Sequence, residues 1–205
     1  MFLAFLTDAL LAVLYPQRCR ICGNSVEKHA CGVVCAACWK AQIFTDEGAL
    51  GWYEGALRET VLLLKRQPYL PRHVVDLVRE RAKLFASVTR IVPVPLHEER
   101  LRSRGFNQAT IIGREISKSA GVPLDEMSLI RVSSPKKYRT GLDAKGRQES
   151  VAKAFVVRYP RLVENEEILL VDDVFTTGAT ASACAEALEE AGVKSVSIFT
   201  LAKAR

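Results

Sequence analysis

A strongly apolar strand at 167–172, EILLVD, is the feature that most limits what this chain can fold into. A strand with apolar residues on both sides is buried on both faces, as happens in parallel sheets that helices cover. Further short apolar runs alternate with helical patterns between 91 and 202. The sequence therefore predicts an α/β fold in which helices flank a mostly parallel sheet.

This alternation sets the expected elements. Strands are expected at 49–54, 91–95, 127–132, 154–158, 167–172 and 195–202. Helices are expected at 1–14, 56–66, roughly 72–87, 107–121 and 179–192, the last two ended by glycine. Residues 133–153 are polar and basic and are expected to form a long mobile loop. Ligands of such sheets bind at the carboxyl ends of the strands, so the segments that follow the strands are the candidate sites.

The chain has 205 residues and a formal net charge of +6. This length suits one domain of ordinary size with a small extra module, and we predict a division into 1–45 and 46–205. The excess of Lys and Arg is concentrated in 97–158, whereas 159–205 is acidic. A basic segment attracts phosphate-rich partners, namely nucleotides, pyrophosphate or nucleic acid, although a solvated charged face is the simpler alternative.

The first residues, MFLAFLTDALLAVL, are largely apolar and carry one acid, Asp8. They are too short to span a bilayer, and they lack the basic start and the cleavage site of a signal peptide. We expect a short helix packed on the body of the protein, with a membrane-surface anchor as the alternative. The chain is thus expected to have no transmembrane segment and to be cytoplasmic.

Five of the six cysteines crowd into 19–38, where two C-x-x-C pairs are formed by Cys19, Cys22, Cys35 and Cys38. Two residues between cysteines let both sulfurs face one ion, and four thiolates complete a closed, structural zinc site. The pattern predicts a small N-terminal module that folds around Zn²⁺ in a reducing compartment. Cys31 and His29 lie inside the span, and either one could replace a member of the quartet. The distant Cys184 is expected to fill the core.

The segment Ile168–Thr180, ILLVDDVFTTGAT, joins an apolar strand to two acids, a Thr-Thr-Gly turn and a helix. Backbone N–H groups and threonine hydroxyls at a helix N-terminus form an anion site, and Gly178 lets the backbone approach the ligand. Asp172 and Asp173 can accept hydrogen bonds from vicinal ribose hydroxyls and help to orient a Mg²⁺ shell. The segment therefore predicts a sugar-phosphate site; a buried strand with Asp173 as an ordinary helix cap is the structural alternative.

A second informative segment is Val92–Ala109, VPVPLHEERLRSRGFNQA. It begins with a strand that ends in a tight turn, and its arginines are spaced so that two of them can project from one side. Guanidinium groups suit pyrophosphate because they offer paired N–H donors. Surface arginines beside a helix cap are the alternative, with Asn107 as the cap. The residues that we predict to bind pyrophosphate are Pro95, Leu96, Arg100 and Arg104.

The acid and threonine segment resembles the phosphoribosylpyrophosphate-binding motif of type I phosphoribosyltransferases. The resemblance implies that Asp172 and Asp173 hold the ribose 2- and 3-hydroxyls and are the catalytic candidates, with Asp173 supporting a cationic sugar electrostatically. It also implies that the 5-phosphate is held by Thr176, Thr177, Gly178, Ala179 and Thr180.

Nearly the whole chain resembles the ComF (competence protein F) family, through the N-terminal helix and cysteine module, the stretch 52–66, Val92–Ala109 and the phosphate loop. This implies the type I phosphoribosyltransferase fold with a zinc-ribbon-like module, and a link to DNA uptake in natural transformation. The family usually has Gln-x-Gly-Leu and Arg-x-Asn-Val in the mobile loop. Here Arg139 replaces the glutamine and Ser150 replaces the asparagine, which bears on turnover more than on ribose-phosphate binding.

Three functions fit these residues. The first is transfer of a phosphoribosyl group from phosphoribosyl pyrophosphate to a nitrogen acceptor, with Mg²⁺ on the pyrophosphate. The second is a non-catalytic factor that handles single-stranded DNA through the basic segment 97–158, where aromatic residues for base stacking are scarce. The third is a regulator that senses the metabolite. We favour the first function, in the context of DNA uptake.

Overall fold

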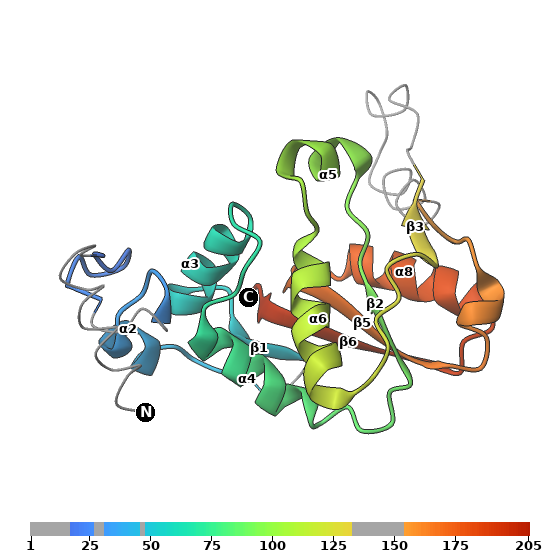
Figure 1. Cartoon of the computed structure of the whole chain (residues 1–205), viewed down its shortest axis with the longest axis horizontal. Helices are drawn as coiled ribbons and strands as arrows, with labels where there is room; N and C mark the ends of the chain where they lie inside the picture. Colours follow the sequence, from blue (N-terminus) through green and yellow to red (C-terminus); the bar gives the residue numbers. More distant parts are fainter. Residues whose placement is uncertain (1–16, 27–30, 46–47, 133–153) are drawn as a thin grey trace.

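A computed structural model of the chain describes residues 17–26, 31–45, 48–132 and 154–205 (Figure 1). Three sequence-based expectations lie outside the described residues. They are the helix at 1–14, the loop at 133–153 with Arg139 and Ser150, and the alternative metal ligand His29.

The described chain alternates between strands and helices. The strands are β1 (Ala49–Trp52), β2 (Arg90–Pro93), β3 (Leu129–Arg131), β4 (Phe155–Val157), β5 (Glu167–Phe175) and β6 (Ser195–Lys203). The helices are α2 (Ala36–Lys40), α3 (Gly55–Leu64), α4 (Arg72–Ala82), α5 (Glu98–Arg104), α6 (Gln108–Ala120) and α8 (Ala179–Glu190), with a 3-10 turn at Pro160–Leu162. Among the described residues, no helix combines the length and the apolar character that a bilayer crossing requires.

Four of the strands form one parallel sheet in the order β1-β6-β5-β2, which confirms the predicted α/β class. The central strand β5 pairs along its whole length with β6, from Glu167 with Ser195 to Phe175 with Lys203. Its apolar part, Ile168–Val171, is at most 1 % exposed. Burial on both faces is what the continuous apolar pattern of this strand requires.

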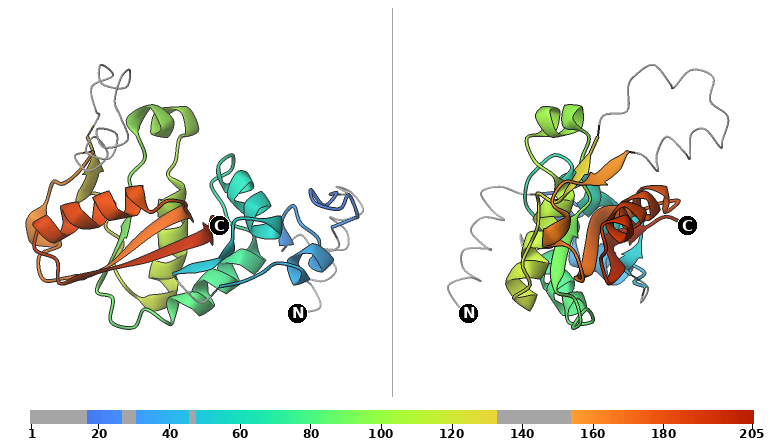
Figure 2. Two further views of the ribbon diagram at one scale, coloured as in Figure 1. Left: turned by 180° about the vertical axis from the view of Figure 1, so that it is seen from behind. Right: turned by 90° about the vertical axis from the view of Figure 1, so that its right-hand side faces the viewer.

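Helices cover both faces of this sheet, with α6 in front of it and α8 behind it (Figure 1). Seen from behind, α8 comes to the front (Figure 2). Side chains of β5 alternate between two apolar clusters: Leu169 and Val171 pack with α3, α4 and α6, whereas Ile168 and Leu170 pack with α8. The alternation over Ile168–Val171 is the ordinary two-residue period of a strand.

The expectation of a mostly parallel sheet needs one correction, because β3 and β4 do not join it. They pair antiparallel with each other as a separate two-stranded sheet, from Leu129 with Val157 to Arg131 with Phe155. Leu129 and Phe155 are buried in the cluster that contains α8. Each strand is three residues long, so this ribbon is stabilised by packing on α8 and β5 rather than by its own ladder.

Several element ends follow the predicted signals. The side chain of Asn107 accepts a hydrogen bond from the N–H of Ala109 and caps α6, and Gly121 ends that helix with a φ of 70°. Helix α4 ends at Ala82, before the predicted 87. The short helix α5 was not predicted, and strand β5 runs on to Phe175, three residues beyond its predicted end.

The segment that precedes β1 packs into the same core as the sheet. Val34 and Trp39 are buried in the cluster that holds Leu57 and Val61 of α3. The division at 45/46 stays a prediction.

Gln42 connects this N-terminal segment to α3 through three hydrogen bonds. Its Oε1 accepts from the N–H of Leu57 at 3.1 Å, and its Nε2 donates to the carbonyls of Ile43 and Trp52 at 3.0 and 3.3 Å. The side chain thereby satisfies one of the N–H groups that a helix leaves open at its first turn. Because Gln42 is 7 % exposed, water does not replace these bonds when the side chain is lost.

We expect the substitution Gln42→Ala to lower the free energy of unfolding by about 2 kcal/mol, since it leaves the buried N–H of Leu57 without its partner. Urea denaturation followed by circular dichroism measures the change. The matched control is Gln67→Ala, because Gln67 is exposed at the end of α3. Equal stability of the two variants would contradict the role assigned to Gln42.

Candidate phosphate site and cysteine cluster

The candidate phosphate loop leaves the carboxyl end of β5 and enters α8. Gly178 is the N-cap of α8 with a φ of 79°, a left-handed conformation that L side chains rarely adopt. A Cβ at this position would lie 2.9 Å from the ring of Phe175, so space as well as φ favours glycine. The hydroxyl of Thr177 accepts a hydrogen bond from the N–H of Ala179 at 3.4 Å. The loop thus presents the positive end of a twelve-residue helix at the sheet edge.

A small pocket lies between this loop and the sheet. The predicted residues Asp172, Thr176, Gly178 and Thr180 all line it, together with apolar side chains such as Val94. Thr177 and Ala179 are exposed and lie outside the lining. No Lys or Arg among the described residues lines this pocket. The groups that this pocket offers to an anion are therefore helix N–H groups and hydroxyls rather than side-chain cations.

The two acids of the motif point to different sides of β5. Asp172 follows Leu170 on the face of α8 and lines the pocket with it. Asp173 follows Val171 on the face of α3 and α6, and its Oδ2 lies 3.4 Å from Nζ of Lys65. The backbone N–H of Asp173 donates to Oδ1 of Asp172 at 2.7 Å. The two carboxylates are thus neighbours with separate surroundings.

Asp172 is held in an unfavourable electrostatic environment. Burial, followed by the charge of Asp173, raises the pKa of Asp172 to about 7, although the backbone N–H of Asp173 and Lys65 act in the opposite direction. The thiol of Cys184 on α8 is buried beside it, as the prediction of a core cysteine requires, and its pKa is raised by burial and by Asp172.

A second, larger cleft of about 480 Å³ lies beside the end of β2, and the predicted Pro95 and Leu96 line it. The cleft is enclosed by α5, α6 and β3, and it has an apolar part with Leu101, Phe106 and Ile130. Nδ2 of Asn107 donates to the carbonyl of Val94 at 2.9 Å and ties the turn after β2 to the start of α6.

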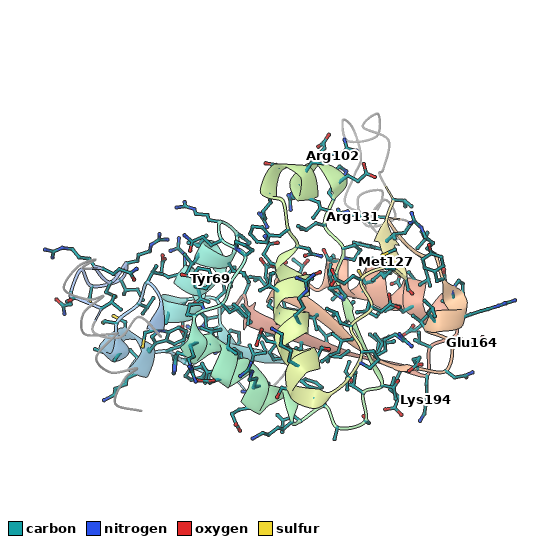
Figure 3. All side chains as sticks on the ribbon, viewed as in Figure 1. Tyr69, Arg102, Met127, Arg131, Glu164 and Lys194 are labelled. Carbon is teal, nitrogen blue, oxygen red and sulfur yellow. The ribbon has the colours of Figure 1, made fainter. Side chains whose placement is uncertain are left out.

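The arginines of this cleft differ from the predicted ones. Arg100 is exposed on α5, Arg104 is half-buried near its end, and neither lines the cleft or the pocket. The lining instead includes Arg114, Arg131 and Arg158. Figure 3 shows Arg131 beside β3, below Arg102 of α5.

These three arginines were missed because they come from three separate elements. Arg114 lies on α6 and pairs with Glu126 at 3.1 Å, and the guanidinium of Arg131 stacks over the ring of Phe155 at 5.3 Å. Each stands singly in the sequence within or beside an apolar run. Arg131 and Arg158 lie at or near the ends of predicted strands, which was the available signal for them, whereas Arg114 lies in the middle of a predicted helix.

Four cysteine sulfurs converge at the N-terminal side of the molecule. Those of Cys19, Cys22, Cys35 and Cys38 all lie within 4.8 Å of one another. Sγ of Cys22 and Sγ of Cys35 are 3.7 Å apart. Zinc–sulfur bonds of tetrahedral sites imply sulfur pairs about 3.8 Å apart, so this donor set fits a closed zinc site.

The surroundings of the cluster also suit a bound cation. Burial opposes ionisation of Cys19, but backbone N–H groups of Cys35, Cys22 and Ile21 lower its pKa to about 6. Cys31 lies outside the cluster, and its carbonyl accepts a hydrogen bond from Nε1 of Trp39 at 3.2 Å. Within the described residues the quartet is therefore the predicted one.

The parallel sheet, the strand that ends in two acids and the glycine-capped helix define a phosphoribosyltransferase-type α/β domain. The family model described as "Phosphoribosyl transferase domain" matches residues 102–205, and the chain belongs to this family.

Individual proteins that are similar to this chain narrow the comparison within this family. Competence protein F of Haemophilus influenzae is 28 % identical over 91 % of this chain and 84 % of its own length. Competence protein ComFC of Bacillus subtilis is 27 % identical over 89 % of this chain and 76 % of its own length. DNA utilization protein YhgH of Salmonella typhi is 32 % identical over 56 % of this chain and 49 % of its own length. The expected resemblance to ComF-type proteins is thus confirmed over most of the chain, and this chain forms the predicted four-cysteine cluster.

Because the folded state raises the pKa of Asp172, the folded protein binds more protons than the unfolded chain between about pH 4 and pH 7. This group therefore makes the protein less stable as the pH rises through that window, and the loss persists above it. We expect Asp172→Asn to raise the melting temperature at pH 8 and to have a much smaller effect at pH 4. Thermal denaturation across this pH range tests it, with the exposed Asp76→Asn as the control. A gain that did not grow with pH would contradict the assigned environment.

We expect the purified chain to carry about one equivalent of zinc and to lose thermal stability when a chelator removes it, because the cluster packs into the main core. Cys22→Ser should abolish zinc retention, whereas Cys31→Ser should keep it. Metal analysis by mass spectrometry distinguishes the two. Equal loss of zinc in both variants would place Cys31 in the site.

Proposed function

We propose that the chain binds phosphoribosyl pyrophosphate, or a ribose 5-phosphate group, at the carboxyl end of β5. The observation that carries the proposal is the convergence of Asp172, Thr176, Gly178 and Thr180 on one pocket at the start of α8. Hydroxyl and N–H donors beside carboxylate acceptors match a ligand with both phosphate and sugar hydroxyls. Membership of the phosphoribosyl transferase domain family supports the same ligand class.

In this proposal the 5-phosphate sits on the loop Thr176–Thr180, including Thr177 and Ala179, and the ribose hydroxyls bind Asp172 and Asp173. The pyrophosphate extends toward the turn at Pro95 and Leu96, beside the end of the neighbouring strand. Mg²⁺ enters with the pyrophosphate as part of the substrate. Its charge offsets the two carboxylates, which the single Lys65 does not balance.

The proposed reaction is transfer of the phosphoribosyl group to a nitrogen acceptor with release of pyrophosphate. The chain contributes by positioning the two reactants and by the negative charge of Asp172 and Asp173, which stabilises a cationic sugar. The contact of Arg100 and Arg104 with the pyrophosphate stays part of the proposal, although neither lines the pocket or the cleft. Arg131 lines the cleft together with Pro95 and Leu96 and is a further candidate for this contact.

The process we propose for this chain is DNA utilization, on the basis of its relatives. Two of them are competence proteins and a third is a DNA utilization protein. The cleft is lined by Arg114, Arg131 and Arg158 beside Glu98 and Glu126, and its small excess of arginines favours contact with single-stranded DNA as a second candidate function. The cysteine quartet is proposed to hold structural Zn²⁺ in the module 1–45, with 46–205 as the ligand-binding domain.

We expect isothermal titration calorimetry to show saturable binding of phosphoribosyl pyrophosphate in the presence of Mg²⁺. The double variant Asp172→Ala, Asp173→Ala should weaken it by more than about ten-fold, because hydrogen bonds to charged acceptors contribute about 1.5–3 kcal/mol each. Asp76→Ala on the exposed surface of α4 serves as the control.

The same titration separates the candidate functions. Binding that the double variant retains would place the ligand outside the pocket. Absence of binding by the wild-type chain, together with salt-dependent binding of single-stranded oligonucleotides, would favour the DNA-handling function instead.

A further inference from the structure

Lys65 reaches the candidate site from a part of the chain that no phosphate motif includes. It is the C-cap of α3, and its backbone N–H donates to the carbonyl of Val61 at 3.0 Å. Leu57, Val61 and Leu64 of this helix are fully buried, so α3 has a fixed place against the sheet. The Lys65 ammonium therefore starts from a fixed helix end and meets Asp173 at the carboxyl end of β5, with Nζ 3.4 Å from Oδ2.

This ion pair differs from exposed local pairs such as Lys83 with Glu80 and Arg102 with Glu98, which contribute little to stability. Like Arg79 with Glu115 and Arg90 with Asp125, it joins separate elements of the fold. The side chain of Asp173 is 15 % exposed, and its partner comes from another layer of the fold. Such a pair constrains the direction of the carboxylate more than an exposed pair does.

The need for such a constraint arises from the neighbouring acid. Asp172 and Asp173 are adjacent at the strand end, and like charges at this distance repel each other. Without a cation, Asp173 lowers its energy by turning toward solvent. One lysine does not saturate a carboxylate, since its two oxygens offer about four acceptor positions. The pair therefore fixes Asp173 and leaves it able to accept a hydrogen bond from a ligand.

The order of atoms in the sugar assigns a hydroxyl to each acid. The pocket that contains the phosphate loop also contains Asp172, whereas Asp173 stands on the other face of β5. In ribose 5-phosphate, carbon 3 is nearer to the phosphate-bearing carbon 5 than carbon 2 is. A sugar whose phosphate lies on the loop therefore offers its 3-hydroxyl to Asp172 and its 2-hydroxyl to Asp173.

We propose that Lys65 is a positioning residue that orients Asp173 toward the 2-hydroxyl of the sugar, so that the site selects ribose 5-phosphate over 2-deoxyribose 5-phosphate. The inference rests on the proposed function, because it requires a sugar phosphate in the pocket. It adds to that function a preference for ribose over 2-deoxyribose and names Lys65 as the residue on which this preference depends.

The test compares binding of ribose 5-phosphate and 2-deoxyribose 5-phosphate by calorimetry. The wild-type chain should prefer the ribose compound by about ten-fold or more, as expected for one hydrogen bond to a charged acceptor. In Lys65→Met this ratio should fall to near one, through loss of affinity for the ribose compound alone. Lys65→Arg should retain most of the preference, because it keeps the cation.

The neighbouring exposed residue supplies the matched control. Arg66→Met removes the same charge from the same helix end and should leave the ratio at its wild-type value. Lys65→Gln is a second neutral variant with the same expected loss of preference, and it serves if Lys65→Met does not fold by circular dichroism.

The outcomes separate this inference from the proposed function. An unchanged ratio in folded Lys65→Met or Lys65→Gln overturns the role of Lys65 while the sugar-phosphate site stands. Equal loss of affinity for both sugars in these variants also overturns it, because that pattern indicates a general structural effect. If the wild-type chain binds neither sugar phosphate, the proposed function fails and the inference falls with it.

Discussion

The burial of β5 on both faces is the constraint on which the rest of the structure depends. Ile168–Val171 is at most 1 % exposed between the helix layers, so the strand has no freedom to shift by one residue without placing acids in the core. Fixing this register fixes where Asp172 and Asp173 emerge and which layer each one faces. The same strand end sets the start of the loop that leads into α8. The position of the candidate site is thus a consequence of core packing.

The N-terminal cysteine segment reaches this strand end through a chain of contacts. Trp39 and Val34 pack into the core beside α3, and Gln42 completes the hydrogen bonds at the beginning of that helix. The other end of α3 carries Lys65, which meets Asp173. Loss of order around the four sulfurs would therefore loosen the helix that delivers the cation to the acid pair. A metal bound by the four cysteines would therefore affect the position of Lys65 and Asp173 without contacting either residue.

The features that depend on a local sequence pattern could be predicted from the sequence alone. The apolar run before Asp172, the glycine at 178 and the cap at Asn107 are encoded within a few residues, and each was found. The separate pairing of β3 with β4 was not foreseeable, because an apolar run does not say which sheet it joins. Helix α5 escaped notice because it buries no residue and therefore has no apolar face. The Lys65 contact depends on tertiary packing between distant segments, which no spacing rule records.

The charges of the candidate site are unbalanced in the free chain, and the proposed ligand with its Mg²⁺ would balance them. Two carboxylates stand beside one lysine, and no Lys or Arg among the described residues lines the pocket itself. Taken alone this arrangement repels an anion, and the pKa of Asp172 is raised first by burial and then by the charge of Asp173. A phosphate bound as proposed at the glycine-capped helix end would meet N–H groups and hydroxyls of the loop, which offset the repulsion by the acids. Mg²⁺ that accompanies a pyrophosphate would then offset the acids. The arginines of the neighbouring cleft are therefore better suited to a second anionic partner than to the sugar phosphate itself.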